Sequence, residues 1–133
     1  MNKLEPRASE LLNDIYTSAM MIIDRLKDET LESFASDANI LLQDAIAYRF
    51  SIIGEASSVL LKKYPDFCGQ HPEIPLQQAR RMRNVLVHDY GRILWPLVWK
   101  TVQDELPQLL ASIVPYVNAD VELEEDDSNS PSS

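Results

Sequence analysis

A long stretch without proline, residues 37–63, constrains the fold of this chain more than any other feature. Its apolar positions suit a helix, and at about 100° per residue they cover well over half of the helix circumference. These positions are Ala38, Leu41, Leu42, Ala45, Ile46, Phe50, Ile52, Ile53, Ala56, Val59 and Leu60. A helix that packs against the core with a single face needs a narrower apolar arc than this. We therefore expect a long helix that packs on two sides, and another subunit is one candidate for the second side.

A second periodic segment precedes this stretch. Apolar residues at steps of three and four from Leu12 to Leu26 predict an amphipathic helix over roughly residues 8–27. The polar residues 28–36 are expected to connect the two helices. Residues 64–75 contain three prolines and Gly69, so we expect a loop there.

Prolines and a glycine mark the remaining boundaries. Pro75 is expected to open a third helix that runs to about residues 88–90 and ends before Gly91. Pro96 suits the start of a fourth helix, and Pro107 either kinks that helix or begins another. Because no strand pattern occurs, the predicted fold is all-α, an up-and-down bundle of four to five helices.

The charge of the chain is unevenly distributed. The formal net charge of −9 argues, taken by itself, against binding to nucleic acid. Residues 119–133 hold six acids and no base, which leaves 15 acids against 12 bases in residues 1–118. Four arginines between Arg80 and Arg92 face one acid, Asp89. We therefore expect one helical domain over residues 1–118 with a basic segment that permits an RNA site, followed by an acidic, Ser-rich disordered tail over 119–133.

The cellular setting follows from what the sequence lacks. Cys68 is the single cysteine, so no intrachain disulfide can form, which suits a reducing cytosol. Neither a secretory signal nor the roughly 18 apolar residues of a membrane-spanning helix is found. We therefore expect a cytoplasmic protein without a membrane partner. No Cys/His cluster, Gly-rich phosphate loop or paired-carboxylate motif occurs, so neither a metal nor a cofactor is expected.

The residues with chemistry lie in the segment Arg80–Tyr90. On a helical wheel one side is expected to be buried, with Ala79, Met82, Val85 and Leu86. The opposite side carries Gln77, Arg80, Arg81, Asn84 and His88. Arg83 lies at the margin of this polar arc, about 140° from His88, so its long side chain must extend to reach the same spot. We expect one exposed stripe with an imidazole, an amide and several guanidiniums.

Such a stripe fits metal-free cleavage of RNA. The reaction needs a base for the 2′-hydroxyl proton, an acid for the leaving 5′-oxygen and positive charge near the phosphate. Histidine can serve in either proton role, and arginine binds phosphate oxygens. One chain supplies one histidine here, so two-histidine chemistry requires a homodimer. Taken alone, Arg83 and His88 also fit a solvated surface, and Arg80 and Arg81 fit an RNA-binding rim better than a catalytic role.

Three other features carry structural expectations. Arg49 falls within the apolar arc of residues 37–63, so it either pairs with a carboxylate or marks an interface. His71 lies in a proline-rich segment and is expected to be exposed. Trp95, Trp99 and the pair Met20–Met21 are expected in the core.

Several short motifs resemble one known family. Arg83-Asn-Val-Leu-Val-His88 resembles the R-N-x-x-x-H motif of HEPN domains, and its extension to Tyr90 resembles the R-x4-H-x-Y form of HepT ribonuclease toxins. Ile53-Gly54-Glu55-Ala56 is similar to a motif on the long helix of that family. Shorter similarities lie at Ile74-Pro75 and at Trp99…Leu106-Pro107.

The resemblance covers roughly residues 8–115. It implies the HEPN fold and a metal-independent endoribonuclease, the toxin of a toxin–antitoxin pair, that forms a homodimer with a composite active site. It also implies that Arg83 and His88 are catalytic and that Asn84 supports them. In such pairs the antitoxin MntA, a minimal nucleotidyltransferase, inactivates the toxin by AMPylating the tyrosine of the motif, which is Tyr90 here.

Two departures from the family pattern occur. Leu94 stands where an Asp commonly precedes the helix of Trp99, which removes a helix N-cap. Leu76 stands where an aromatic residue is common. The alternative function is a non-catalytic HEPN module that docks a nucleotidyltransferase, and the negative net charge favours it because like charge repels RNA.

Overall fold

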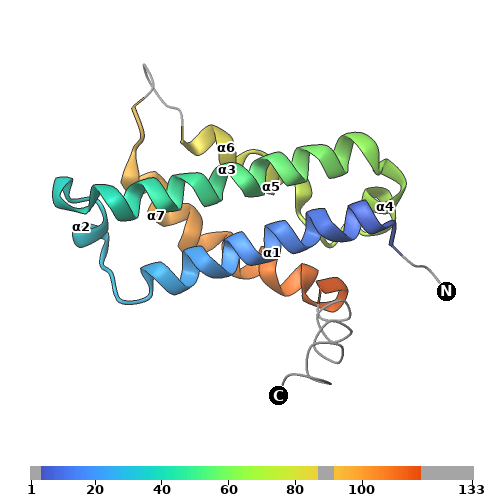
Figure 1. Ribbon diagram of the computed structural model, residues 1–133, viewed down its shortest axis with the longest axis horizontal. Helices are drawn as coiled ribbons and strands as arrows, with labels where there is room; N and C mark the ends of the chain where they lie inside the picture. Colours follow the sequence, from blue (N-terminus) through green and yellow to red (C-terminus); the bar gives the residue numbers. More distant parts are fainter. Residues whose placement is uncertain (1–3, 87–91, 118–133) are drawn as a thin grey trace, which may run out of the picture.

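The structure is a computed structural model that describes residues 4–86 and 92–117, and no β-strand forms within these ranges. The helices form an elongated bundle (Figure 1). They are α1 (Pro6–Leu26), α2 (Leu31–Phe34), α3 (Ile40–Lys63), α4 (Pro65–Gln70), α5 (Leu76–Arg80), α6 (Met82–Val85) and α7 (Trp95–Asp104), with a 3-10 turn at Asp37–Asn39 and helical residues 106–117. The predicted all-α fold is confirmed. The predicted tail, residues 119–133, lies outside the described residues.

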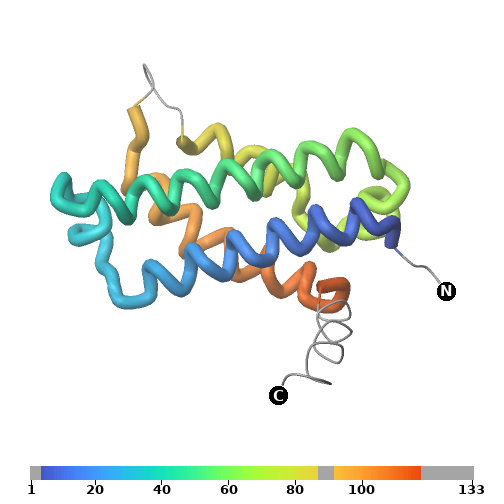
Figure 2. Tube along the Cα trace, in the orientation of Figure 1, coloured from blue at the N-terminus to red at the C-terminus, as the bar shows by residue number. Residues whose placement is uncertain are grey.

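The two long helices, α1 and α3, lie side by side and run in opposite directions (Figure 2). The stripe predicted on α1 is buried, with Leu12, Ile15, Ala19 and Ile22 at most 1% exposed. From α3, the fully buried Ile46, Phe50 and Ile53 belong to the same core. Both predicted helices are therefore present, although α3 begins at Ile40 rather than at Asp37 because the preceding residues form the 3-10 turn.

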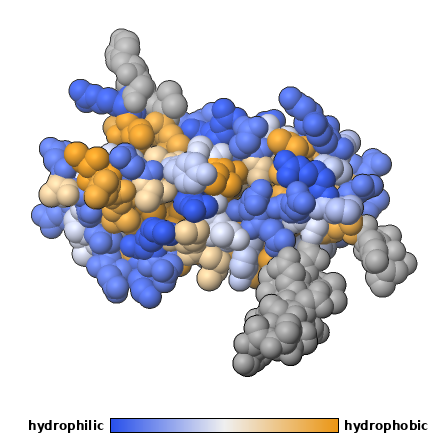
Figure 3. Space-filling view, viewed as in Figure 1, coloured by the Kyte–Doolittle hydropathy of each residue, from blue (hydrophilic) through white to orange (hydrophobic). Residues whose placement is uncertain are grey.

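Helix α3 packs on two sides, as the width of its apolar arc predicts. α1 covers one side, whereas α5 and α6 of the same chain cover another. The second contact uses the buried Leu76, Ala79 and Met82. At the start of α3, Ile40 and Leu41 stay 57% and 86% exposed. Figure 3 shows apolar surface gathered at this end of the molecule. Another subunit is thus not needed for the second side of α3, but its first turn leaves an apolar surface uncovered.

Two predicted boundaries are wrong. Residues 64–75 are not all loop, because Pro65 opens α4 from a first-turn position where proline is tolerated. The predicted third helix is divided at Arg81 into α5 and α6. There the Arg81 N–H donates to the carbonyls of both Gln77 (3.3 Å) and Gln78 (3.1 Å), and ψ is −6°. This tightening of 3-10 type ends α5 before the motif residues begin.

Helix α7 closes one end of the core against α2. Phe34 packs edge-on against Trp95, with ring centroids 5.4 Å apart, and also contacts Trp99 at 5.9 Å. Both tryptophans therefore pack against the core, as predicted. A turn at Glu105 separates α7 from the helical residues that follow, so Pro107 begins another helix rather than kinking α7.

Met20 is 42% exposed, so the prediction that the Met20–Met21 pair lies in the core is wrong for this residue.

Within residues 4–86 and 92–117, no helix combines the length and the apolar character that crossing a membrane requires.

Candidate active site

The side chain of Arg83 crosses from α6 onto α3. Its aliphatic carbons lie against Gly54, where an added Cβ would stand 2.1 Å from Arg83 Cγ and 2.8 Å from Cδ. Non-bonded carbon atoms are most stable at about 3.5–4.0 Å, so no larger residue fits at position 54 while Arg83 keeps this position. The glycine is needed for this close approach of two helices.

The guanidinium of Arg83 is held by the next residue on α3. Its Nη1 donates a hydrogen bond of 2.9 Å to Glu55 Oε1. The two side chains are 52% and 65% exposed, and ion pairs of this kind contribute about 1 kcal/mol or less to stability. A guanidinium has five N–H donors, and the bond to Glu55 uses one atom of this fork. Glu55 therefore orients Arg83 and leaves donors free for another oxygen ligand.

Arg83 lies at a groove between α1 and α3. The groove has a volume of about 640 Å³ and is lined by side chains of both long helices together with Arg83. Its charged lining residues are Arg7, Asp14, Arg49, Glu55 and Arg83. Arg7 pairs with Glu10 at 3.0 Å, and Arg83 pairs with Glu55. The groove thus gathers three guanidiniums, two of which pair with carboxylates.

The other described motif residues lie as the helical wheel predicts. Asn84, Arg80 and Arg81 are exposed, while Ala79 and Met82 are buried. Arg81 also lines a hollow with Glu105, at the edge of the predicted stripe. The stripe as a whole stays a prediction, because it includes His88. His88 and Tyr90 lie outside the described residues.

The charge environment of Arg81 is set by Glu105. Burial raises the pKa of the Glu105 carboxyl, and a hydrogen bond from Gln78 and the charge of Arg81 oppose this increase. Arg81 thus faces an acidic neighbour, whereas no acidic side chain within the described residues forms an ion pair with Arg80 or Arg49. The two predicted rim arginines are therefore not equivalent.

Periodicity alone assigns no role to Gly54 and Glu55. In the sequence, only a resemblance to a family motif marks the Ile53–Ala56 segment, and the structure gives a physical reason for that motif. Glu55 lies 28 positions before Arg83. No local spacing rule connects residues so distant in sequence.

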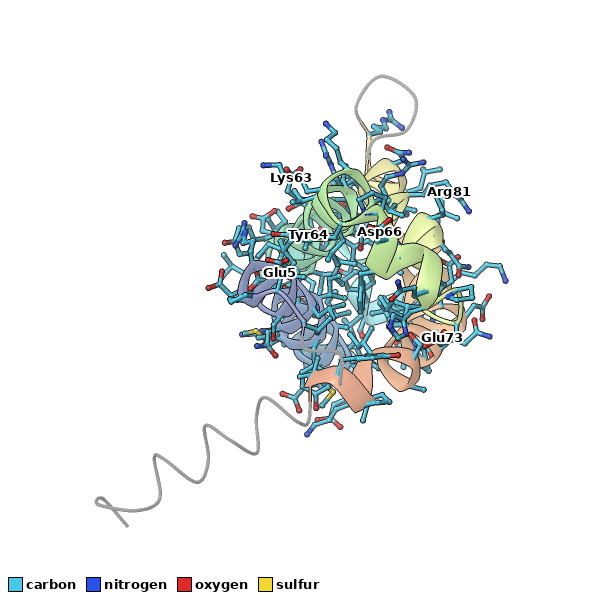
Figure 4. All side chains as sticks on the ribbon, turned by 90° about the vertical axis from the view of Figure 1, so that its right-hand side faces the viewer. Glu5, Lys63, Tyr64, Asp66, Glu73 and Arg81 are labelled. Atoms are coloured by element: carbon cyan, nitrogen blue, oxygen red, sulfur yellow. The ribbon has the colours of Figure 1, made fainter. Side chains whose placement is uncertain are left out.

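A second polar cluster joins the segment after α4 to the helical residues 106–117. The Tyr116 hydroxyl lies 2.6 Å from His71 Nδ1 and donates to Glu73 Oε2 at 2.8 Å, while the His71 ring packs on Phe67 with centroids 4.6 Å apart. The prediction of an exposed His71 is therefore wrong, since its side chain is 26% exposed. Figure 4 shows Glu73 beside the C-terminal helix, at the end of the bundle opposite the start of α3.

This cluster shifts two pKa values. A hydrogen bond from its own backbone N–H, and then that from Tyr116, lower the pKa of Glu73. Burial and the adjacent Glu73 carboxylate raise the pKa of Tyr116. The hydrogen bonds of this cluster thus link the segment after α4 to the helical residues 106–117.

Within the described part of the chain, no group of three His, Cys, Asp or Glu side chains is placed to hold a metal ion.

Comparison with known proteins places the chain in one family. Residues 15–114 match the family model described as ribonuclease HepT-like. The chain is 36% identical over 101 residues to "Probable ribonuclease HepT" of Thermococcus cleftensis, covering 75% of this chain and 86% of that protein. It is 31% identical over 129 residues to "Putative RNase MJ0127" of Methanocaldococcus jannaschii, covering 96% and 99%. No solved structure matches the chain. The chain belongs to the HepT-like ribonuclease family.

Proposed function

We propose that this chain is the toxin of a toxin–antitoxin pair and a metal-independent endoribonuclease. Arg83 and His88 are its catalytic residues, Asn84 supports them, and Arg80 and Arg81 attract the RNA backbone. The observation that carries the proposal is the position of Arg83. Its stem rests on Gly54 and its guanidinium is bound by Glu55 while half of the side chain stays exposed at the groove.

This arrangement suits cleavage by the ribose 2′-oxygen. A base removes the 2′-hydroxyl proton, the oxygen attacks the adjacent phosphorus, and the bond to the 5′-oxygen breaks. An acid protonates that oxygen, which leaves a 2′,3′-cyclic phosphate. His88 is assigned one of the two proton roles. Arg83 is always charged and is held in place before substrate arrives, so it can stabilise the negative charge that develops on the phosphate.

The second proton role requires a second copy of the chain. We propose a homodimer in which two motif helices meet and each contributes one histidine. The exposed apolar side chains of Ile40, Leu41, Leu94 and Leu97 support a dimer, because they are 38–86% exposed to solvent in the single chain. Light scattering is expected to give about twice the mass of one chain. A stable monomer that cleaves RNA would contradict the composite site.

Control of the nuclease is assigned to Tyr90. We propose that an MntA-like nucleotidyltransferase joins the Tyr90 oxygen to the α-phosphate of ATP and releases pyrophosphate. The added AMP is bulky and negative, so it repels RNA phosphates and competes for the arginines. Mass spectrometry of the co-expressed pair is expected to locate AMP on Tyr90. If Tyr90→Phe remains toxic and is still fully neutralised by an active partner, modification of this residue is not the switch.

The nuclease proposal is tested with His88→Ala. The unchanged chain is expected to cut single-stranded RNA in the presence of a metal chelator, and His88→Ala is expected to abolish the cut because it removes the proton-transfer group. Undiminished cleavage by His88→Ala, or loss of activity on chelation, would contradict the mechanism.

The alternative function is a docking module without catalysis, which the −9 net charge favours. Induction in a bacterial host separates the two. Growth arrest that requires both Arg83 and His88 supports the nuclease, whereas the absence of toxicity with or without the nucleotidyltransferase supports the module.

A further inference from the structure

A second guanidinium, that of Arg49, lies in the same groove as Arg83. Arg49 lines the groove together with Ile52, Ala56 and Val59, which follow it on α3 at steps of three and four. Such steps place all four residues on one face of the helix. Arg49 is therefore directed to the groove by the helix itself, on the face that α3 turns toward α1.

Arg49 has no acidic partner within the described residues. Its Nη1 donates a long hydrogen bond of 3.4 Å to Ser18 Oγ, and its Cζ lies 5.2 Å from the centroid of the Tyr48 ring. Of the two carboxylates that line the groove, Glu55 pairs with Arg83, and Asp14 forms no ion pair with Arg49. Arg49 is also half-buried. A partly buried charge without a counter-ion is costly, so an anion in the groove would be stabilised there.

The neighbour of Arg49 suggests the class of anion. The Tyr48 ring is 60% exposed beside the guanidinium. An exposed aromatic ring next to a cation is typical of single-stranded nucleic-acid sites, where the cation binds a phosphate and the ring stacks on a base. A purely inorganic anion would not need the ring.

We propose that Arg49 and Tyr48 form an RNA subsite that binds a backbone phosphate and an adjacent base, at a nucleotide next to the one that Arg83 contacts. This inference rests on the proposed function. Arg49 and Glu55, the partner of Arg83, are six residues apart on α3, a rise of about 9 Å. The two arginines therefore bind different phosphates of one strand, and the strand follows the groove between α1 and α3.

Binding of a fluorescent single-stranded RNA to the His88→Ala protein tests the subsite. Arg49→Gln is compared with Arg25→Gln, which removes the same charge from the exposed last turn of α1, outside the groove. Arg49→Gln is expected to weaken affinity about tenfold, as loss of a charge-assisted hydrogen bond does. It is also expected to reduce the slope of log affinity against log salt by about 0.7, the value for one phosphate on a single strand.

Tyr48→Ala is expected to weaken binding to a similar degree without changing the salt slope, because stacking releases no counter-ion. Arg25→Gln should leave both quantities close to those of the parent. Equal affinity and slope for Arg49→Gln and Arg25→Gln would overturn the subsite. A change of molecular mass in light scattering on Arg49→Gln would also overturn it, since the groove would then be a subunit interface.

Failure of the subsite and failure of the nuclease give different results. If the unchanged chain cleaves RNA but Arg49→Gln binds as the control does, the subsite alone is wrong. If the unchanged chain neither cleaves nor binds RNA, the proposed function is wrong and the subsite with it.

Discussion

Arg83 depends on two residues of another helix, Gly54 beneath its stem and Glu55 beside its guanidinium. Catalysis by a positioned cation needs the cation in place before the transition state forms. At the scale of single residues, the proposed active site is therefore shared between α3 and α6. Substitution of Gly54 or Glu55 should therefore displace the Arg83 side chain, although Arg83 itself is unchanged.

Gly54→Ala tests whether cleavage depends on the contact between the Arg83 side chain and Gly54. The new Cβ would occupy the place of Arg83 Cγ, so the stem must move. Cleavage is expected to fall on the order of 10²-fold, the cost of misplacing a catalytic group by about 1 Å. The free energy of unfolding should change by no more than about 2 kcal/mol, because the helical gain from alanine offsets part of the overpacking.

Gly69→Ala is the matched control for this substitution. Gly69 lies in α4, and an added Cβ there meets nothing within 4 Å. Stability is expected to rise by up to about 1 kcal/mol with cleavage unchanged. Cleavage by Gly54→Ala at the rate of the unchanged chain would show that catalysis does not depend on the contact between Arg83 and Gly54.

Glu55→Ala removes the carboxylate that orients Arg83. Cleavage is expected to fall about tenfold, because Arg83 loses the hydrogen bond that positions it. The free energy of unfolding, measured in urea, is expected to decrease by less than about 1 kcal/mol. Asp104→Ala breaks a comparably exposed pair with Lys100, 2.8 Å apart and away from the groove, and should cost as little stability without slowing cleavage. If Glu55→Ala cleaves RNA as fast as Asp104→Ala does, Glu55 does not position Arg83 for cleavage.

Glu73 adds a pH dependence at the other end of the bundle. Its pKa in the folded protein lies below the ordinary value of 4.5, so the stability that it contributes is present above that value and is lost as pH falls through the folded pKa. Tyr116→Phe removes one of the donors that lower this pKa. Urea unfolding is expected to show the variant less stable at about pH 7, with the difference shrinking at about pH 3. A difference that persists unchanged at low pH would exclude the carboxylate as its source.

At the scale of elements, periodicity predicts long helices better than short ones. The stripes of α1 and α3 predict both helices to within a few residues, because each buries a repeated apolar face. The division at Arg81 could not be predicted, since it arises from a local tightening of backbone hydrogen bonds within an uninterrupted apolar pattern. The pairing of Arg83 with Glu55 likewise depends on how α6 is set against α3, which no sequence spacing encodes.

Leu94→Asp tests an element boundary. Leu94 is the N-cap of α7, has extended backbone angles and makes no side-chain cap hydrogen bond. An aspartate there can accept from the Leu97 N–H and lies at the positive end of the helix dipole. The free energy of unfolding is expected to rise by about 1 kcal/mol. A decrease measured in urea would mean that the 40% exposed leucine contributes more through apolar contacts than an N-cap restores.

At the scale of the whole molecule, the negative charge and the proposed RNA substrate are reconciled by distribution. Residues 119–133 carry six of the acids and no base, while the groove between α1 and α3 gathers three arginines against two acids, Asp14 and Glu55. The motif predicts Arg83 as the central residue, and the structure places it at this groove. RNA approaching the groove therefore meets a local charge that differs from the net charge.

The proposed mechanism is tested most directly by single-turnover cleavage of single-stranded RNA in the presence of a chelator, with the unchanged chain and with Arg83→Ala. The unchanged chain is expected to leave 2′,3′-cyclic phosphate ends. Arg83→Ala is expected to cleave on the order of 10²–10³-fold more slowly, because it removes one preorganised donor to the charge that develops on the phosphate. Cleavage by Arg83→Ala at the rate of the unchanged chain would contradict this mechanism.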